Sequence, residues 1–213
     1  MTKVKARIIR FLVFGSLALF LTGAYVLVTG SEQKTTSVSS KTSSVAGIKI
    51  GGPYTLTDHT GKKVTDKDYQ DKYKLIYFGF TYCPAVCPTE LQKLSSALKK
   101  LGPVSESIHP VFITVDPERD TVDVMNTYVS HYHPDLIGLT GTPAQIKNVL
   151  KSYKIYAAKV QDEDASDYTM DHSSFIYLMS PDDSLIKIFR TQDTAEYIAS
   201  STRDLIKARE GQI

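Results

Sequence analysis

The stretch KLIYFGFTYCPAVCPTELQKLSSALKKL, residues 74–101, decides the fold. Residues 74–80 form an almost continuous apolar run, which is typical of a strand buried on both faces of a sheet. After a short loop, residues 88–101 carry leucines at helical spacing, and Gly102-Pro103 ends the pattern. The stretch therefore predicts a central strand that leads through a loop into an amphipathic helix.

On both sides of this stretch, strand patterns alternate with helix patterns. We expect a hairpin over 54–64, strands at 111–115, 174–179 and 185–189, and helices at 121–131, 143–153 and 195–209. Strands that alternate with helices and close on a hairpin favour an α/β sandwich with a mixed central sheet.

The segment before this domain has three parts. Residues 1–10 carry four cations, residues 11–30 carry no charge, and residues 31–49 are rich in Ser and Thr. About 20 apolar residues cross a bilayer as a helix, and cations before them favour an N-terminus on the inner side. We therefore expect a cytoplasmic basic stub, a transmembrane anchor at 11–30, a flexible linker at 31–49 and the folded domain at 50–213.

Two alternatives to the anchor are a cleaved signal peptide and a buried core helix. A signal peptide usually has an apolar run of only ~7–15 residues and a small-x-small cleavage site. Neither feature is evident here, although the residues around 29–31 resemble such a site. The uncleaved anchor is therefore the favoured interpretation.

The charges are unevenly distributed along the 213 residues. The whole chain has 25 basic and 23 acidic residues, but four of the cations lie within the first ten residues. The remainder is slightly acidic, so the sequence gives no indication of a nucleic-acid-binding surface.

The chain has two cysteines, Cys83 and Cys87, between the central strand and the helix that follows. Open α/β folds bind ligands at this edge of the sheet. Pro88 suits the first helical position, which would place Cys87 at the helix N-terminus, where a thiol pKa is lowered. If the loop turns helically, two thiolates four residues apart face the same side and suit Cu(I) or Zn(II).

Three other interpretations compete with a metal site. Outside the cytoplasm, two cysteines commonly form a structural disulfide, but one that closes so short a loop restrains the unfolded chain little. Thiol redox enzymes usually space their cysteines by two residues rather than three. Two buried core cysteines are disfavoured because a proline follows each of them. The residues alone leave metal binding, redox chemistry and a structural role open.

Three motifs together resemble the Sco/SenC family of copper chaperones for cytochrome c oxidase assembly. They are YFGFTYCPAVCPTE at 77–90, VDPERDT at 115–121 and YTMDHSS at 168–174. The resemblance extends over about residues 50–210 and includes the anchor. It implies a thioredoxin-like fold, membrane attachment and delivery of copper to the oxidase subunit that holds the binuclear copper centre.

The resemblance places the family's copper ligands on Cys83, Cys87 and His172, with one copper, Cu(I) or Cu(II), per domain. His172 is expected to open the strand at 174–179 after a polar stretch and to swing toward the metal. The resemblance also places an aspartate that borders the family's copper site on Asp116. This residue is expected to be a weak copper ligand or to lie just behind the ligands. The alternative for Asp116 is an Asp-Pro turn, with Asp120 capping the next helix.

Other donors are weaker candidates. His131 and His133 would make an alternating metal pair, but a polar helix end explains them. Met170 would be a soft axial ligand of the metal, but the favoured interpretation is that its side chain fills a packing gap near the site.

The sequence is therefore interpreted as a copper metallochaperone rather than an enzyme. The alternative is a thiol–disulfide oxidoreductase that reduces the copper-ligand cysteines of the oxidase, with Cys83 and Cys87 as its redox disulfide. A peroxiredoxin-like peroxidase is disfavoured.

The expected partners are the oxidase copper subunit, a second copper chaperone as donor and a thiol reductant. The expected location is the bacterial inner membrane with the domain in the periplasm, or the mitochondrial inner membrane facing the intermembrane space in a eukaryote.

Overall fold

The computed structural model describes residues 49–161 and 167–211. The predicted basic stub, the anchor at 11–30 and almost all of the linker lie outside the described residues. Within the described part of the chain, no helix is both long enough and apolar enough to cross a membrane.

A seven-stranded mixed sheet forms the centre of the domain. Its strands run in the order β2-β1-β5-β4-β3-β8-β9. The three central strands are parallel: β3 (Tyr73–Gly79), β4 (Ile108–Thr114) and β5 (Ile137–Thr140). The four flanking strands each run antiparallel to a neighbour: β1 (Thr55–Asp58), β2 (Lys63–Thr65), β8 (Phe175–Met179) and β9 (Leu185–Arg190).

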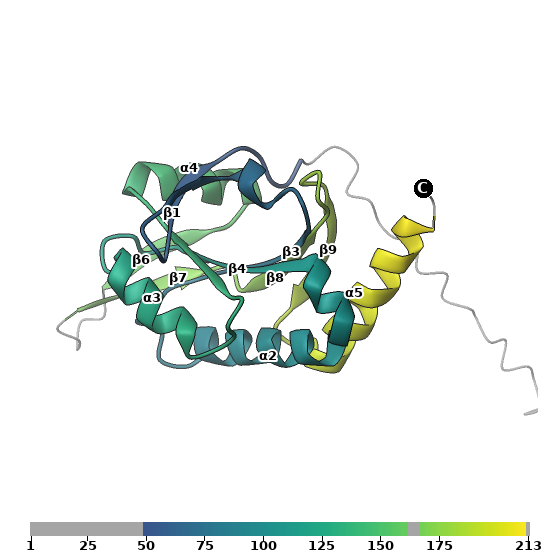
Figure 1. Cartoon of the computed structure of the whole chain (residues 1–213). Coiled ribbons are helices and arrows are strands. Elements are labelled where there is room, and N and C mark those ends of the chain that lie inside the picture. Colours follow the sequence, from purple (N-terminus) through teal and green to yellow (C-terminus); the bar gives the residue numbers. More distant parts are fainter. Residues whose placement is uncertain (1–48, 162–166, 212–213) are drawn as a thin grey trace, which may run out of the picture. The chain divides into compact units, whose positions relative to one another are not determined.

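Helices cover both faces of this sheet (Figure 1). One face carries α2 (Val86–Leu101), α3 (Val122–Ser130) and α5 (Ala195–Glu210), whereas α4 (Pro143–Tyr153) lies on the other. Crossovers between parallel strands are almost always right-handed, and the two from β3 to β4 and from β4 to β5 lead in the same direction across the sheet, which accounts for α2 and α3 lying on the same side. Two short 3-10 helices, Asp66–Tyr69 and Gly102–Ser107, complete the layers. The predicted α/β sandwich with a mixed sheet is confirmed.

Strand β3 connects the two layers of the core. All seven of its residues are buried, and successive side chains point to opposite faces. Phe78 packs against Tyr153 of α4, with ring centroids 5.2 Å apart. Tyr77 points the other way and reaches Cys87 near the start of α2. The strand predicted from its apolar run is thus the strand that positions the cysteine loop.

Two features of the fold were not predicted. Strand β5 was missed, and so was a separate two-stranded hairpin of β6 (Ala157–Gln161) and β7 (Tyr168–His172). The prediction that His172 opens the strand at 174–179 was wrong, because His172 is the last residue of β7. In register, His172 pairs with Ala157 of β6. The hairpin therefore holds the histidine from outside the main sheet.

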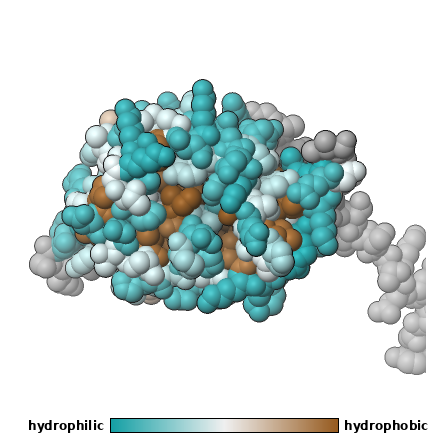
Figure 2. All heavy atoms as spheres, in the orientation of Figure 1, coloured by the Kyte–Doolittle hydropathy of each residue, from teal (hydrophilic) through white to brown (hydrophobic). Residues whose placement is uncertain are grey.

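Hydrophilic side chains predominate on the face drawn in Figure 2, with apolar residues visible between them. Among the described residues, two of the large exposed apolar side chains belong to the cysteine loop and its helix. Tyr82 is 61% exposed and Val86 is 46% exposed.

Candidate metal centre

Gly79, at the end of β3, allows the helix start to approach the sheet closely. A Cβ at this position would lie 2.8 Å from Cys87 Sγ and 3.0 Å from ring carbons of Phe112 and Tyr77. Such distances are too short for any side chain, so only glycine lets Cys87 pack directly on the strand. The loop at 80–85 then connects β3 to α2.

Asp120 fixes the start of the cysteine loop. Its buried carboxylate accepts hydrogen bonds from Thr81 N at 3.1 Å, from Thr81 Oγ1 at 2.6 Å and from the hydroxyl of Thr114. Burial raises the pKa of Asp120, against the effect of these donors. The prediction that Asp120 caps the next helix was wrong, because Thr121 caps α3 by accepting from Val124 N.

The two cysteines have opposite environments. Cys83 is half-buried and its Sγ accepts a hydrogen bond from Cys87 N at 3.4 Å, whereas Cys87 is fully buried. The thiol of Cys87 and then the backbone N–H groups of Cys87, Ala85 and Val86 lower the pKa of Cys83 to about 5, against the effect of burial. The hydrogen bond to Cys83 and then burial raise the pKa of Cys87.

This result corrects the prediction for Cys87. Helix α2 begins at Val86, two residues earlier than expected, so Pro88 is its third residue. The thiol of Cys87 points into the core, and the N–H groups of the first turn point at Cys83 instead. The helix N-terminus therefore stabilises a thiolate on Cys83. Both cysteines are free thiols in the structure.

His172 meets Cys87 from the hairpin side. Its Nε2 lies 3.6 Å from Cys87 Sγ, and its Nδ1 lies 3.0 Å from the carbonyl oxygen of Ser173. A carbonyl only accepts, so Nδ1 carries the proton and the lone pair of Nε2 faces the sulfur. The imidazole is held edge-on by Phe80 and Tyr77, with ring centroids 5.7 and 6.5 Å away.

These contacts suit a metal ligand set of sulfur and nitrogen. Thiolate and imidazole donors bound to one tetrahedral ion at ~2.3 and ~2.0 Å would be about 3.5 Å apart, close to the observed separation of Cys87 and His172. Soft thiolates with one imidazole are a donor set that copper accepts. Over residues 49–161 and 167–211, however, no three His, Cys, Asp or Glu side chains are close enough to hold an ion as they stand.

Asp116 is buried beside the site and both its carboxylate oxygens are engaged. Oδ1 accepts from the hydroxyl of Tyr168 at 2.8 Å, and Oδ2 pairs with the guanidinium of Arg119. The Asp-Pro turn is also present, since the Asp116 carbonyl accepts from the amides of Arg119 and Asp120. In this structure the carboxylate of Asp116 therefore binds protein groups.

Arg119 links the cysteine loop to the hairpin, a role that sequence reasoning missed. The guanidinium carbon lies 4.7 Å from the ring centroid of Tyr82 and 3.8 Å from that of Tyr168. It also donates to the carbonyl of Tyr168 at 2.8 Å. Tyr82 precedes Cys83, and Tyr168 begins the strand that ends at His172. A cation between two aromatic rings is attracted to both faces, so Arg119 holds these two segments together.

The weaker candidates lie elsewhere or pack into the core. His131 is the C-cap residue of α3, and His133 accepts from the amide of Asp135. Met170 of β7 is partly buried against the hydrophobic core, as the gap-filling interpretation predicted.

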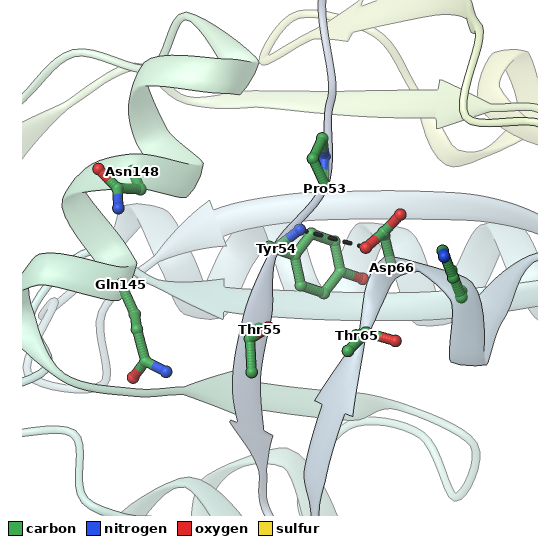
Figure 3. A pocket seen from close by; sticks show the side chains of 8 residues that line it. Pro53, Tyr54, Thr55, Thr65, Asp66, Gln145 and Asn148 are labelled. Atoms are coloured by element: carbon green, nitrogen blue, oxygen red, sulfur yellow. Dashed lines mark hydrogen bonds between the residues drawn. The ribbon is translucent and has the colours of Figure 1, made fainter.

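Two surface hollows on the described part of the chain are lined by residues other than the cysteines. One, of about 410 Å³, is lined by Tyr54 just before β1, by Asp66 just after β2, and by Gln145 and Asn148 of α4, among others (Figure 3). There Asp66 accepts from the amide of Tyr54 at 3.2 Å. Another, of about 620 Å³, is lined by residues that include His59 and His109. The cysteine–histidine site is a contact between the first turn of α2 and the end of the β6–β7 hairpin.

Comparison with known proteins identifies the family. The family model described as SCO1/SenC matches residues 42–207. Protein SCO1 homolog 1, mitochondrial, of Arabidopsis thaliana is 44% identical over 181 residues, which are 80% of this chain and 54% of that protein. The chain therefore spans about half the length of this curated relative.

Two solved structures share the fold. The crystal structure of Arabidopsis thaliana ScoI with copper bound has a TM-score of 0.71 at 45% identity, covering 75% of this chain and 99% of that one. The structure of Bradyrhizobium japonicum ScoI with copper bound has a TM-score of 0.68 at 46% identity, covering 73% and 99%. The thioredoxin-like fold implied by the sequence motifs is confirmed. This chain belongs to the SCO1/SenC family.

Proposed function

We propose that this protein is a copper metallochaperone that holds one copper ion through Cys83, Cys87 and His172 and helps assemble the copper centre of cytochrome c oxidase. The observation that carries the proposal is the 3.6 Å approach of His172 Nε2 to Cys87 Sγ, in a loop that also holds Cys83. The copper-bound structures of two relatives support copper as the cargo.

The arrangement suits transfer as well as binding. Cys83 is partly accessible and carries a lowered pKa, so one thiolate is available to an incoming ion at neutral pH. Cys87 is buried, and its sulfur and the imidazole of His172 already lie against each other. Because the donors do not yet enclose an ion, loading involves a movement of at least one of the three side chains. Three protein donors leave a coordination position open for exchange with a donor chaperone or with the oxidase copper subunit.

Replacing His172→Ala in the full-length protein is expected to abolish tight Cu(II) binding and to leave Cu(I) binding largely intact. Imidazole is the donor that suits both oxidation states, whereas two thiolates alone still hold Cu(I). We expect the Cu(II) dissociation constant to rise by at least about 10-fold to 100-fold, since outer-shell changes alone cost that much. Metal stoichiometry and the Cu(II) absorption spectrum measure the effect.

The matched control is His131→Ala, which removes an exposed imidazole at the end of α3. Its copper content and spectrum should equal those of the wild type. An unchanged Cu(II) spectrum in the His172→Ala protein would remove His172 from the ligand set.

A second candidate function is thiol–disulfide oxidoreduction, favoured by the half-buried Cys83 with its lowered pKa beside the buried Cys87. The Cys83 thiolate would attack a disulfide of the oxidase subunit and form a mixed disulfide, releasing one thiolate. Cys87 would then attack Cys83, which frees the second thiol and leaves a Cys83–Cys87 disulfide for an external thiol reductant. The His172→Ala protein separates the two functions, because a dithiol reductase keeps its activity without the imidazole.

We also propose that residues 11–30 anchor the protein in the bacterial inner membrane with the domain in the periplasm, or in the mitochondrial inner membrane facing the intermembrane space in a eukaryotic cell. The cations at 1–10 and the uncharged run after them support this orientation. Topology reporters fused at residue 40 and after residue 213 should both report the outer side. A soluble mature protein beginning near residue 31 would instead identify a signal peptide.

A further inference from the structure

The buried hydroxyl of Tyr77 lies between Cys87 and the segment that follows His172. The side chain is fully buried in β3, and its hydroxyl lies 3.6 Å from Cys87 Sγ and 3.1 Å from Ser174 Oγ. Ser174 lies two residues beyond His172, in the short connection between β7 and β8. The ring stacks on Phe112, with centroids 6.2 Å apart and an interplanar angle of 17°. The hydroxyl is thus held by the rigid central strand.

A tyrosine hydroxyl has one proton to donate, so two arrangements are possible here. In one, Tyr77 donates to Ser174 and leaves the sulfur without this donor. In the other, Ser174 donates to Tyr77, and Tyr77 donates to Cys87. A hydrogen bond to a charged acceptor is about twice as strong as one between neutral groups. A thiolate at Cys87, as in the copper-bound protein, therefore favours the second arrangement. In the copper-free protein the Cys87 thiol donates to Nε2 of His172, so its sulfur is left to accept from Tyr77.

We propose that Tyr77 is a positioning residue whose hydroxyl donates a hydrogen bond to the Cys87 sulfur in the reduced and copper-bound protein, and so weakens the donation of electrons from this sulfur to copper. The copper part of this inference rests on the proposed function, because it takes Cys87 as a ligand. A hydrogen bond to a ligand sulfur stabilises its lone pairs, and this favours Cu(I) over Cu(II). Through Ser174 the same hydroxyl connects Cys87 to the segment that carries His172.

The test is Tyr77→Phe in the full-length protein, which removes one hydroxyl and keeps the ring. We expect the thiolate-to-Cu(II) charge-transfer absorption to move to longer wavelength, because the sulfur lone pairs rise in energy. We expect the Cu(II)/Cu(I) equilibrium to shift toward Cu(II) by about tenfold, the size of one hydrogen bond to a charged group. For a one-electron couple, tenfold is about 59 mV.

Tyr128→Phe is the matched control. The Tyr128 hydroxyl is buried and has no hydrogen-bond partner among the described residues, and its ring also packs on Phe112. This variant should leave both the absorption and the copper equilibrium unchanged. Ser174→Ala should leave them within about twofold of the wild type, since Tyr77 keeps its proton for the sulfur. If Ser174→Ala shifted them as far as Tyr77→Phe, the proposal would be wrong.

A second substitution guards against misfolding of Tyr77→Phe. Placing 3-fluorotyrosine at position 77 keeps the hydroxyl and the shape but makes the hydroxyl a stronger donor. The absorption should then move to shorter wavelength than in the wild type. An absorption equal to the wild type in both the Tyr77→Phe and the fluorinated protein would overturn the proposal.

A copper-free measurement separates this inference from the proposed function. In equilibrium with glutathione, the Cys83–Cys87 disulfide and two glutathione thiols exchange for the dithiol and glutathione disulfide. Loss of a donor to the reduced sulfur should favour the protein disulfide by about fivefold in Tyr77→Phe. If the wild-type protein bound no copper, the proposed function would be wrong, but this equilibrium would still test the role of Tyr77. A glutathione equilibrium in Tyr77→Phe equal to that of the wild type would contradict the proposed hydrogen bond to Cys87.

Discussion

Joining Cys83 and Cys87 in a disulfide is expected to abolish copper binding. Metal ligation needs thiolates, whereas oxidation consumes both sulfurs and leaves the imidazole of His172 as the remaining donor of the proposed set. The bond is within reach, because Cys83 Sγ already contacts Cys87 N at 3.4 Å. The loss of Cu(I) affinity should exceed about 100-fold, since it removes two direct ligands.

The experiment uses copper-free protein that is oxidised until two free thiols are lost, then offered Cu(I) without reductant under anaerobic conditions. Reduction of the same sample should restore the thiols and the copper stoichiometry together, which controls for damage during oxidation. Full-affinity binding with the disulfide still intact would rule out the cysteines as ligands.

Replacing Gly79→Ala should destabilise the domain and weaken copper binding at the same time. The added methyl group would lie 2.8 Å from Cys87 Sγ and 3.0 Å from carbons of Phe112 and Tyr77, which are all buried. Overpacking of this kind costs about 1–3 kcal/mol of the free energy of unfolding. Since β3 is paired on both sides, we expect Cys87 to move away from the strand and from His172.

Gly52→Ala is the matched control, because its nearest neighbour would be Ser152 at 3.6 Å, an ordinary contact. Denaturant unfolding measures the stability and Cu(I) competition measures the affinity. A Gly79→Ala protein with wild-type stability and wild-type copper affinity would contradict this prediction. It would show that the first turn of α2 can move to accept the methyl group without loss of stability or of copper binding.

The elements that could be predicted from the sequence are those with strong local periodicity. The apolar run of β3 and the leucine spacing of α2 gave both elements to within two residues at each end. Helix α4 was placed at its observed bounds, because Pro143 marks its start and its apolar residues keep a helical spacing. Strand β5 has four residues, one of them Gly138, and so shows little pattern. The β6–β7 hairpin is largely exposed, so apolar alternation did not mark it.

The sequence motifs could name the residues of the candidate site, but not the contacts that support them. The motifs pointed to Cys83, Cys87 and His172, and these residues do come together in pairs. The hydrogen bonds from Thr81 to Asp120 join residues 39 positions apart in the sequence. A local sequence pattern does not predict a contact between residues so far apart. Which cysteine carries the lowered pKa depends on how each side chain leaves the first turn of α2, and spacing alone does not fix that direction.

The sequence separation of the two contacting donors has a consequence for the order of maturation. Cys87 and His172 are 85 residues apart along the chain and meet across strands of the assembled sheet. Bringing together the ends of a flexible loop of this length costs about 4 kcal/mol of chain entropy. An unfolded chain therefore offers an ion the two cysteines of the loop alone. In the proposed ligand set the imidazole joins them after the sheet has formed, so a chain with this topology folds first and takes up its full complement of donors second.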